Sequence, residues 1–135
     1  MNTKWISRIV SLVLAAGCIA LLAGAPVRAA DTIKIGFFGP LTGPFAGLGI
    51  DAKKGADLAV NEINGSGGIN RKKVELVSYD DRGNRAEAVS VVRKLIEQDK
   101  VIAIVNGSLS LTSIAAAPFV NAAMTPMVVA YSNGV

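Results

Sequence analysis

The feature that most constrains the fold of this chain is an alternation of two hydrophobic periods from residue 32 onward. Four short runs rich in β-branched and apolar residues indicate strands at 32–38, 73–79, 101–105 and 126–130. Between them, apolar residues recur at helical spacing over 50–64, over 85–99 and through Ala115, Ala116 and Val120. This βα alternation predicts an α/β fold with a doubly wound parallel sheet. A closed barrel would need about eight such units, so the length excludes it.

Each helix carries signals of its own. The first helix ends at an Asn-Gly pair, which is typical of a C-cap. Five of its residues are expected to face the core: Ala52, Ala56, Ala59, Val60 and Ile63. The second begins with Asn84 and Glu87, close to a capping box, and should turn Val89, Val92 and Ile96 inward. In the third, Pro118 either kinks the helix or lies in its first turn.

The first 29 residues have the layout of a secretory signal peptide. Lys4 and Arg8 precede an apolar run, and Pro26 leads into small residues that fit a cleavage site after Ala29. A membrane anchor would need about 20 apolar residues, and this run is shorter and is followed by a cleavage signal. Export with removal of 1–29 is therefore the preferred interpretation, which leaves 30–135 as the mature part.

The one cysteine, Cys18, lies inside this leader. Its "AAGC" context loosely resembles a lipoprotein cleavage box, but Ala15 stands where leucine is usual and the apolar run continues past the cysteine. Lipidation at Cys18 is therefore a minority alternative. After cleavage no cysteine remains, so the exported chain has no disulfide and depends on its core.

The charge of the mature part argues against nucleic acid as a partner. Without Lys4, Arg8 and Arg28, 11 basic residues face 10 acidic ones, so the basic character of the whole chain comes mostly from the leader. Trp5 leaves with the leader as well, and no aromatic platform for bases or sugars is visible. The remaining stretch of about 105 residues has the size of one domain.

Ligands of open parallel sheets bind outside the carboxyl ends of the strands, so the segments that leave those ends matter most. These are 39–50, 80–84, 106–112 and 130–135, and only 80–84 contains a charged residue. Together they and the adjacent helix start offer uncharged polar side chains: Thr42, Asn106, Ser108, Ser110, Thr112, Ser113, Ser132 and Asn133. With helix-start amides, such a set suits a small carboxylate. Alternatively, Ser110 or Thr112 caps its helix and the remaining side chains are solvated.

Two other chemical interpretations are weaker. Gly47, Gly49 and Ala52 match G-x-G-x-x-A, but the dinucleotide fingerprint should follow its strand at once and these residues do not. Asp80 and Asp81 could hold a metal or act as acid and base. Because the chain has no histidine and no third ligand at a recognisable spacing, turn and cap roles are preferred. No catalytic constellation is present, which predicts a protein that is not an enzyme and needs no metal or cofactor.

A family resemblance rests on several motifs in order. "GPLTGPFAGLG", "GA-LAV-EIN-GGI", "YDD" and "A-V-V-R-KLI" before "VIAIVNG" cover nearly all of the mature chain. With these motifs it resembles the start of the periplasmic substrate-binding proteins of branched-chain amino-acid ABC transporters. The resemblance implies a type I binding protein with two lobes, of which 30–135 would be a partial N-terminal lobe and the second lobe is absent.

The resemblance also implies where the ligand binds. In this family the loops after the third and fourth strands hold the ligand with hydroxyls and backbone amides. The position of the family's serine falls on Leu111, flanked by Ser110 and Thr112, and a ligand-contacting aromatic position in the first loop falls on Leu48. The full set of site residues implied is Phe45, Leu48, Ser108, Ser110, Leu111, Thr112, Ser132 and Gly134.

The function implied by the resemblance is that of the solute-binding component of an ABC importer. It would capture a branched-chain or related amino acid in the periplasm and deliver it to a permease in the inner membrane. Three alternatives remain: an extracytoplasmic ligand-sensing receptor domain of the same fold, an exported enzyme or nucleotide-binding domain whose catalytic residues lie elsewhere, and a non-functional truncated copy.

Overall fold

The computed structural model describes residues 32–131, and every structural statement below concerns these residues. They belong to the second of the two compact units of the chain, Asp31–Val135. The predicted signal peptide, Cys18, Ser132 and Gly134 lie outside the described residues.

Four parallel strands form the sheet. They are β1 (Ile33–Gly39), β2 (Val74–Asp80), β3 (Ala103–Asn106) and β4 (Met127–Val129), and their order is β2-β1-β3-β4. β1 pairs with β2 over its whole length and with β3 from Ile35 to Phe38. The predicted α/β fold with a parallel sheet is therefore confirmed, and each strand lies within two residues of its expected position.

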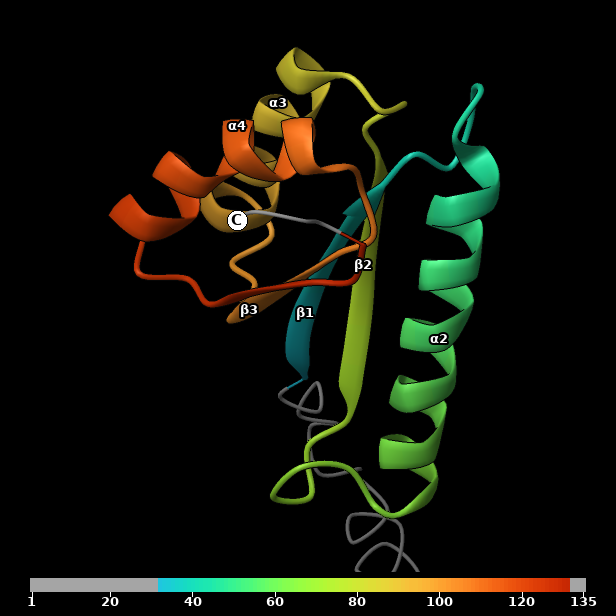
Figure 1. Cartoon of the computed structure of the whole chain (residues 1–135). Helices are drawn as coiled ribbons and strands as arrows, with labels where there is room; N and C mark the ends of the chain where they lie inside the picture. Colours follow the sequence, from blue (N-terminus) through green and yellow to red (C-terminus); the bar gives the residue numbers. More distant parts are fainter. Residues whose placement is uncertain (1–31, 132–135) are drawn as a thin grey trace, which may run out of the picture. The chain divides into compact units, whose positions relative to one another are not determined.

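The helices cover both faces of the sheet. α2 (Ala46–Gly65) lies on one face, and α3 (Arg85–Glu97) and α4 (Ser110–Ala122) pack against each other on the opposite face (Figure 1). This division follows from the strand order. The chain moves from β1 to β2 in one direction across the sheet and from β2 through β3 to β4 in the other, and right-handed crossovers then place the helices on opposite faces.

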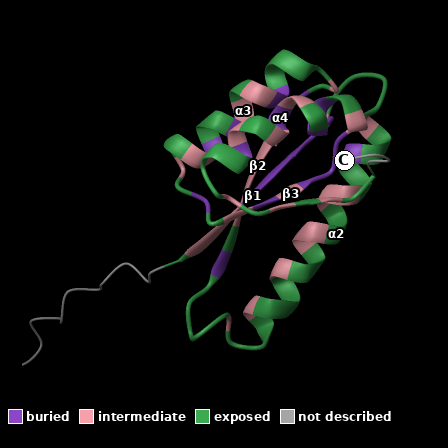
Figure 2. Cartoon of the chain, turned by 60° about the vertical axis from the view of Figure 1, so that its left-hand side comes forward, coloured by how far each residue is buried: buried purple, intermediate pink, exposed green. Residues whose placement is uncertain are grey.

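The core lies mainly between the sheet and the pair α3 and α4. Its buried side chains are Phe38, Ala88, Val92, Leu95, Val101, Ile104, Ala116 and Val120. Figure 2 shows the same imbalance, since the strands and the inner sides of α3 and α4 contain the buried residues while α2 is mostly exposed or half-buried. The hydrophobic effect therefore fixes α3 and α4 more firmly than α2.

The first helix differs from its prediction in its starting residue and in the side chains that face the sheet. It begins at Ala46 rather than at residue 50, because Gly49 has no Cβ and its turn can approach the backbone of Pro40. A Cβ at Gly49 would lie 2.2 Å from the carbonyl oxygen of Pro40. The predicted inward role of Ala59 and Ile63 is wrong, since both are exposed. The face toward the sheet follows an i, i+4, i+8 line and is half-buried: Ala52, Ala56 and Val60.

The other two helices need smaller corrections. In α3 the fully buried residues are Ala88, Val92 and Leu95, whereas Val89 and Ile96 are only half-buried. The buried stripe is thus rotated by about one residue from the expected one. In α4, Pro118 lies well inside the helix and not in its first turn. Because proline has no N–H, the turn around it lacks one backbone hydrogen bond.

Candidate functional site

The candidate site lies at the edge of the sheet where the strands end. β1 and β3 are neighbours there, although the chain leaves β1 toward β2 and leaves β3 toward β4. The winding therefore reverses between β1 and β3, which is the position where open α/β sheets bind ligands. All three helices begin at this edge, each after a short loop that follows a strand (Figure 1).

The helix starts at this edge differ in their capping. At α3, the side chain of Asn84 accepts hydrogen bonds from the N–H groups of Ala86 at 2.8 Å and Glu87 at 3.2 Å, as the sequence predicted. The N-cap residues of α2 and α4 are Phe45 and Leu109, and neither makes a side-chain cap bond. No acidic residue lies in the first turn of either helix. No acidic side chain of their own first turns therefore offsets the positive dipole ends of α2 and α4.

A buried hydrogen-bonded cluster, which we call the serine–threonine cluster, links the end of β3 to the first turns of α4. It consists of Asn106, Ser108, Thr112 and Ser113, all 1% exposed or less. The amide of Asn106 donates to Ser113 Oγ, and its Oδ1 accepts from the Ser108 N–H, both at 2.7 Å. The hydroxyls of Ser108 and Thr112 are 2.7 Å apart. The cluster therefore fixes the loop that leads into α4.

The carbonyl of Leu109 is the common acceptor of this cluster. It accepts from Thr112 Oγ1 at 2.7 Å and from Ser113 Oγ at 2.9 Å. The backbone N–H groups of the same two residues also point to it, at 3.1 and 3.0 Å. Thr112 and Ser113 thus bond backward to the N-cap carbonyl, so the alternative in which Thr112 acts as the N-cap does not apply here.

The predicted site residues separate into two groups. Ser108 and Thr112 are buried in the serine–threonine cluster, whereas Leu111 in the first turn of α4 is 55% exposed. At the start of α2, Phe45 is 45% and Leu48 43% exposed. Ser110, the first residue of α4, is half-buried.

Gly83 brings the starts of α2 and α4 to the same place. A Cβ built on Gly83 would lie 3.2 Å from Cδ2 of Phe45 and 3.7 Å from Cδ1 of Leu109. The two uncapped helix starts therefore border the same turn after β2.

Glycines at this edge serve close packing. A Cβ on Gly107 would lie 2.6 Å from Cβ of Ala52 and 2.8 Å from the ring of Phe37, and one on Gly39 would lie 3.1 Å from the carbonyl oxygen of Gly107. Gly47 lies inside α2 with nothing within 4 Å of its would-be Cβ. The G-x-G-x-x-A match therefore lacks the strand-to-helix turn that a dinucleotide requires.

Asp80 fastens the loop after β1. Its Oδ1 accepts from the N–H groups of Leu41 and Arg82 at 2.8 Å each, and its Oδ2 accepts from the hydroxyl of Thr42 at 2.5 Å. Partial desolvation by itself favours the neutral acid, but the hydrogen bonds from Thr42, Arg82 and Leu41 outweigh it and hold the pKa of Asp80 below its ordinary value. The turn role predicted for this residue is confirmed.

Asp81 has a different environment. It is fully buried, its Oδ1 accepts from the Gly83 N–H at 2.9 Å, and its Oδ2 has no hydrogen-bond partner. Its backbone N–H donates to the Gly39 carbonyl at 3.1 Å. Burial raises the pKa of Asp81, and the charge of Asp80 adds to this, while the Ser108 hydroxyl and the Gly83 N–H act against it. The predicted turn role is confirmed, but the sequence did not indicate the burial or the unpaired oxygen.

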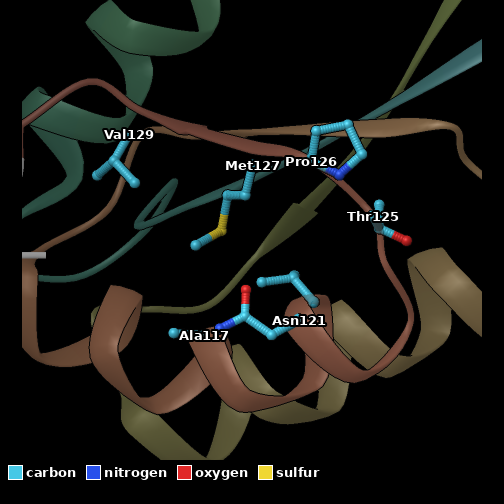
Figure 3. Close-up of a pocket in the computed structure, with 7 residues that line it drawn as sticks. Ala117, Asn121, Thr125, Pro126, Met127 and Val129 are labelled. Atoms are coloured by element: carbon cyan, nitrogen blue, oxygen red, sulfur yellow. The ribbon is translucent and has the colours of Figure 1, made fainter.

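Two hollows lie beside α4. The larger, of about 500 Å³, separates α4 from β4, and Figure 3 shows Asn121 and Met127 facing each other across it. The smaller, of about 360 Å³, lies beside Arg93 and Phe119. Neither contains a predicted site residue. Over residues 32–131, no three His, Cys, Asp or Glu side chains gather in a way that could hold a metal ion, and no helix has the length and apolarity of a membrane span.

Comparison with known proteins gives a consistent result. The family model described as "Periplasmic binding protein" matches residues 32–134. The chain is 47% identical over 83 residues to the Leu/Ile/Val-binding protein BraC3 of Rhizobium johnstonii, a match that covers 62% of this chain and 22% of that protein.

Two solved structures are also similar. The first is the branched-chain amino acid transporter substrate binding protein LivJ of Streptococcus pneumoniae, in complex with isoleucine, with 40% identity, a TM-score of 0.74, and coverage of 76% of this chain and 30% of that one. The second is a solute binding protein of an ABC transporter from Rhodopseudomonas palustris, in complex with 3,4-dihydroxybenzoic acid, with 27% identity, a TM-score of 0.70, and coverage of 76% and 28%. The chain therefore spans less than a third of the length of these proteins.

Proposed function

Since this chain belongs to the periplasmic binding protein family, we propose that it is part of the solute-binding component of an ABC importer. In this proposal the whole protein captures branched-chain or related amino acids in the periplasm and delivers them to a permease in the inner membrane. The names of its relatives support this, because they are Leu/Ile/Val-binding proteins and transporter substrate-binding proteins. The family is one of solute-binding proteins and not of enzymes.

The observation that carries the proposal is the uncapped start of α4 at the switch point of the sheet. Both bound ligands in the similar structures, isoleucine and 3,4-dihydroxybenzoic acid, have a carboxylate. A carboxylate is a group that helix starts favour, and the first turn of α4 contains no acidic residue that would compete with it. We assign the ligand carboxylate to this position.

The predicted site residues then have separate roles. Ser110 and Leu111 lie in the first turn of α4 and contact the carboxylate end of the ligand, while Phe45 and Leu48 contact its variable part. Ser108 and Thr112 are buried and hydrogen-bonded to each other, so they hold the loop in shape from beneath. Ser132 and Gly134, in the segment that follows β4, complete the proposed site.

The proposal includes the arrangement of the chain. Residues 1–29 form the signal peptide, cleaved near Ala29, and lipidation at Cys18 is the minority alternative. Residues 30–135 form part of the first lobe, and the second lobe comes from chain beyond them. Closure of the two lobes over the ligand produces the form that the permease recognises.

Calorimetric titration of the full-length gene product tests the proposal. Isoleucine, leucine, valine and 3,4-dihydroxybenzoate should be compared with isoleucinamide, which keeps the side chain and ammonium of isoleucine but has no carboxylate. We expect at least one carboxylate ligand to bind and the amide to bind far more weakly. Absence of binding to all four carboxylates, or equal binding of isoleucine and its amide, would contradict the proposed function.

A further inference from the structure

Gly83 borders two of the helix starts of the candidate site, and it has no side chain. Its φ of +70° lies in the left-handed region that favours glycine. A Cβ built on Gly83 would lie 3.2 Å from Cδ2 of Phe45, the N-cap of α2, and 3.7 Å from Cδ1 of Leu109, the N-cap of α4. The ring of Phe45 therefore packs close to the turn, at the position where any other residue would place its side chain.

The turn that contains Gly83 is fixed by hydrogen bonds. The N–H of Gly83 donates to Oδ1 of Asp81 at 2.9 Å. Just before it, Oδ1 of Asp80 accepts from the N–H groups of Arg82 and Leu41 at 2.8 Å each, which ties the turn to the loop after β1. Because its backbone is bonded to both sides, this turn resists displacement when a side chain is added at residue 83.

Phe45 is the partner that can move. Its side chain is 45% exposed, so the ring is packed on one side and open on the other. A Cβ at 3.2 Å is closer than ordinary van der Waals contact, and the neighbour must give way by a few tenths of an ångström. The ring of Phe45 would move away from Gly83, toward its own exposed side. This is the side where the proposed function places the variable part of the ligand.

We propose that Gly83 is a positioning residue that sets the size of the ligand, acting through Phe45. Because Gly83 has no side chain, Phe45 stays withdrawn against the turn and leaves room for a large variable part, branched or aromatic. A side chain at residue 83 advances the ring and favours smaller carboxylic acids. This deepens the proposed function and rests on it, since it concerns the same site.

Calorimetric titration of the full-length gene product with isoleucine and valine tests this, because the two ligands differ by one methylene. If the wild type binds aromatic acids instead, 3,4-dihydroxybenzoate and benzoate form the pair. Gly83→Ala should lower the ratio of the affinity for the larger ligand to that for the smaller one about fivefold or more, since one methylene in an apolar pocket is worth about tenfold or more. A ratio within about twofold of the wild type would overturn the inference.

The matched control is Gly67→Ala, in the loop after the end of α2. Gly67 also has a positive φ, of 98°, but nothing lies within 4 Å of its would-be Cβ. Alanine there brings the backbone cost of a non-glycine residue without any contact to Phe45, so the affinity ratio should stay unchanged. Thermal unfolding reports the stability of both variants. An equal fall of the ratio in Gly67→Ala would also overturn the inference, because general strain would then explain it.

A double-mutant cycle shows whether Gly83 acts through Phe45. In the background of Phe45→Ala there is no ring to displace, so Gly83→Ala should no longer change the affinity ratio, and an unchanged effect would contradict the proposed route. If Gly83→Ala does not fold, Gly83→Asn replaces it, since asparagine adopts the left-handed conformation more readily. If the wild type binds no amino acid or aromatic carboxylate, the proposed function itself fails, whereas binding with unaltered selectivity in the variants refutes only this inference.

Discussion

The change Leu109→Asp tests the proposed carboxylate position directly. Leu109 is the N-cap of α4 and makes no side-chain cap bond. An aspartate there can accept from the N–H groups of the first turn, as Asn84 does at α3. It therefore occupies the amides that we assign to the ligand and adds a negative charge beside them.

The magnitude follows from two terms. Competition for the amides is worth about 1 kcal/mol, the usual value of an N-cap. Repulsion between two carboxylates about 5 Å apart, one helical turn, amounts to about 3 kcal/mol near a protein surface. Even with partial screening, a total of about 3 kcal/mol remains, which weakens binding about 100-fold. Leu109→Asn caps without a charge and should weaken binding only about fivefold.

Titration calorimetry with isoleucine measures both affinities, and thermal unfolding checks that each variant is folded. The fold should tolerate the change, since Leu109 is only half-buried and a better cap offsets part of the lost apolar contact. The reasoning is refuted if Leu109→Asp binds isoleucine within about threefold of the wild type. It is also refuted if the asparagine variant loses as much affinity as the aspartate, because charge would then have no part in the effect.

Three further outcomes are expected. Gly49→Ala should lower the free energy of unfolding by about 3 kcal/mol, since the added Cβ would meet the Pro40 carbonyl. Gly47→Ala should be neutral or slightly stabilising, because the space around Gly47 is open. Chemical denaturation compares the two variants. Asn84→Ala should cost about 1 kcal/mol of stability by the same assay without changing affinity for isoleucine, and a loss of affinity would argue against a purely local cap. Burial raises the pKa of Asp81 above 3.8, so the folded state holds this proton more tightly than the unfolded state does. The unfolding free energy of the wild type relative to that of Asp81→Asn should therefore fall as pH rises above 3.8. A rise in this difference would contradict the assignment.

The sequence predicted the sheet well because its strands are short apolar runs bounded by turn residues. It placed the start of α2 too late, since Gly47 and Gly49 indicate a loop when only propensity is considered. In the structure, the contact of Gly49 with Pro40 outweighs that propensity. A close approach of backbone across the loop after β1, which helix propensity does not include, accounts for this boundary.

The candidate site was predicted as a set of loops more accurately than as a set of side chains. Uncharged loops after β1 and β3 do meet at the switch point of the sheet. The sequence could not tell that Ser108 and Thr112 are buried while Leu111 is exposed, because this depends on which side of α4 faces the core. Nor could it show that Asp81 is buried, since adjacent aspartates in a turn are usually solvated.

The glycine contacts at the end of the sheet have a consequence for how such a protein can change over time. Gly49 and Gly107 leave no room for a side chain and Gly39 leaves little, so the floor of the proposed site tolerates little variation. Phe45 and Leu111 stand on the rim with about half of their surface exposed, and exchanging them costs the fold little. A rigid floor with a replaceable rim lets a lineage acquire new ligands by mutation at the rim while its architecture is preserved.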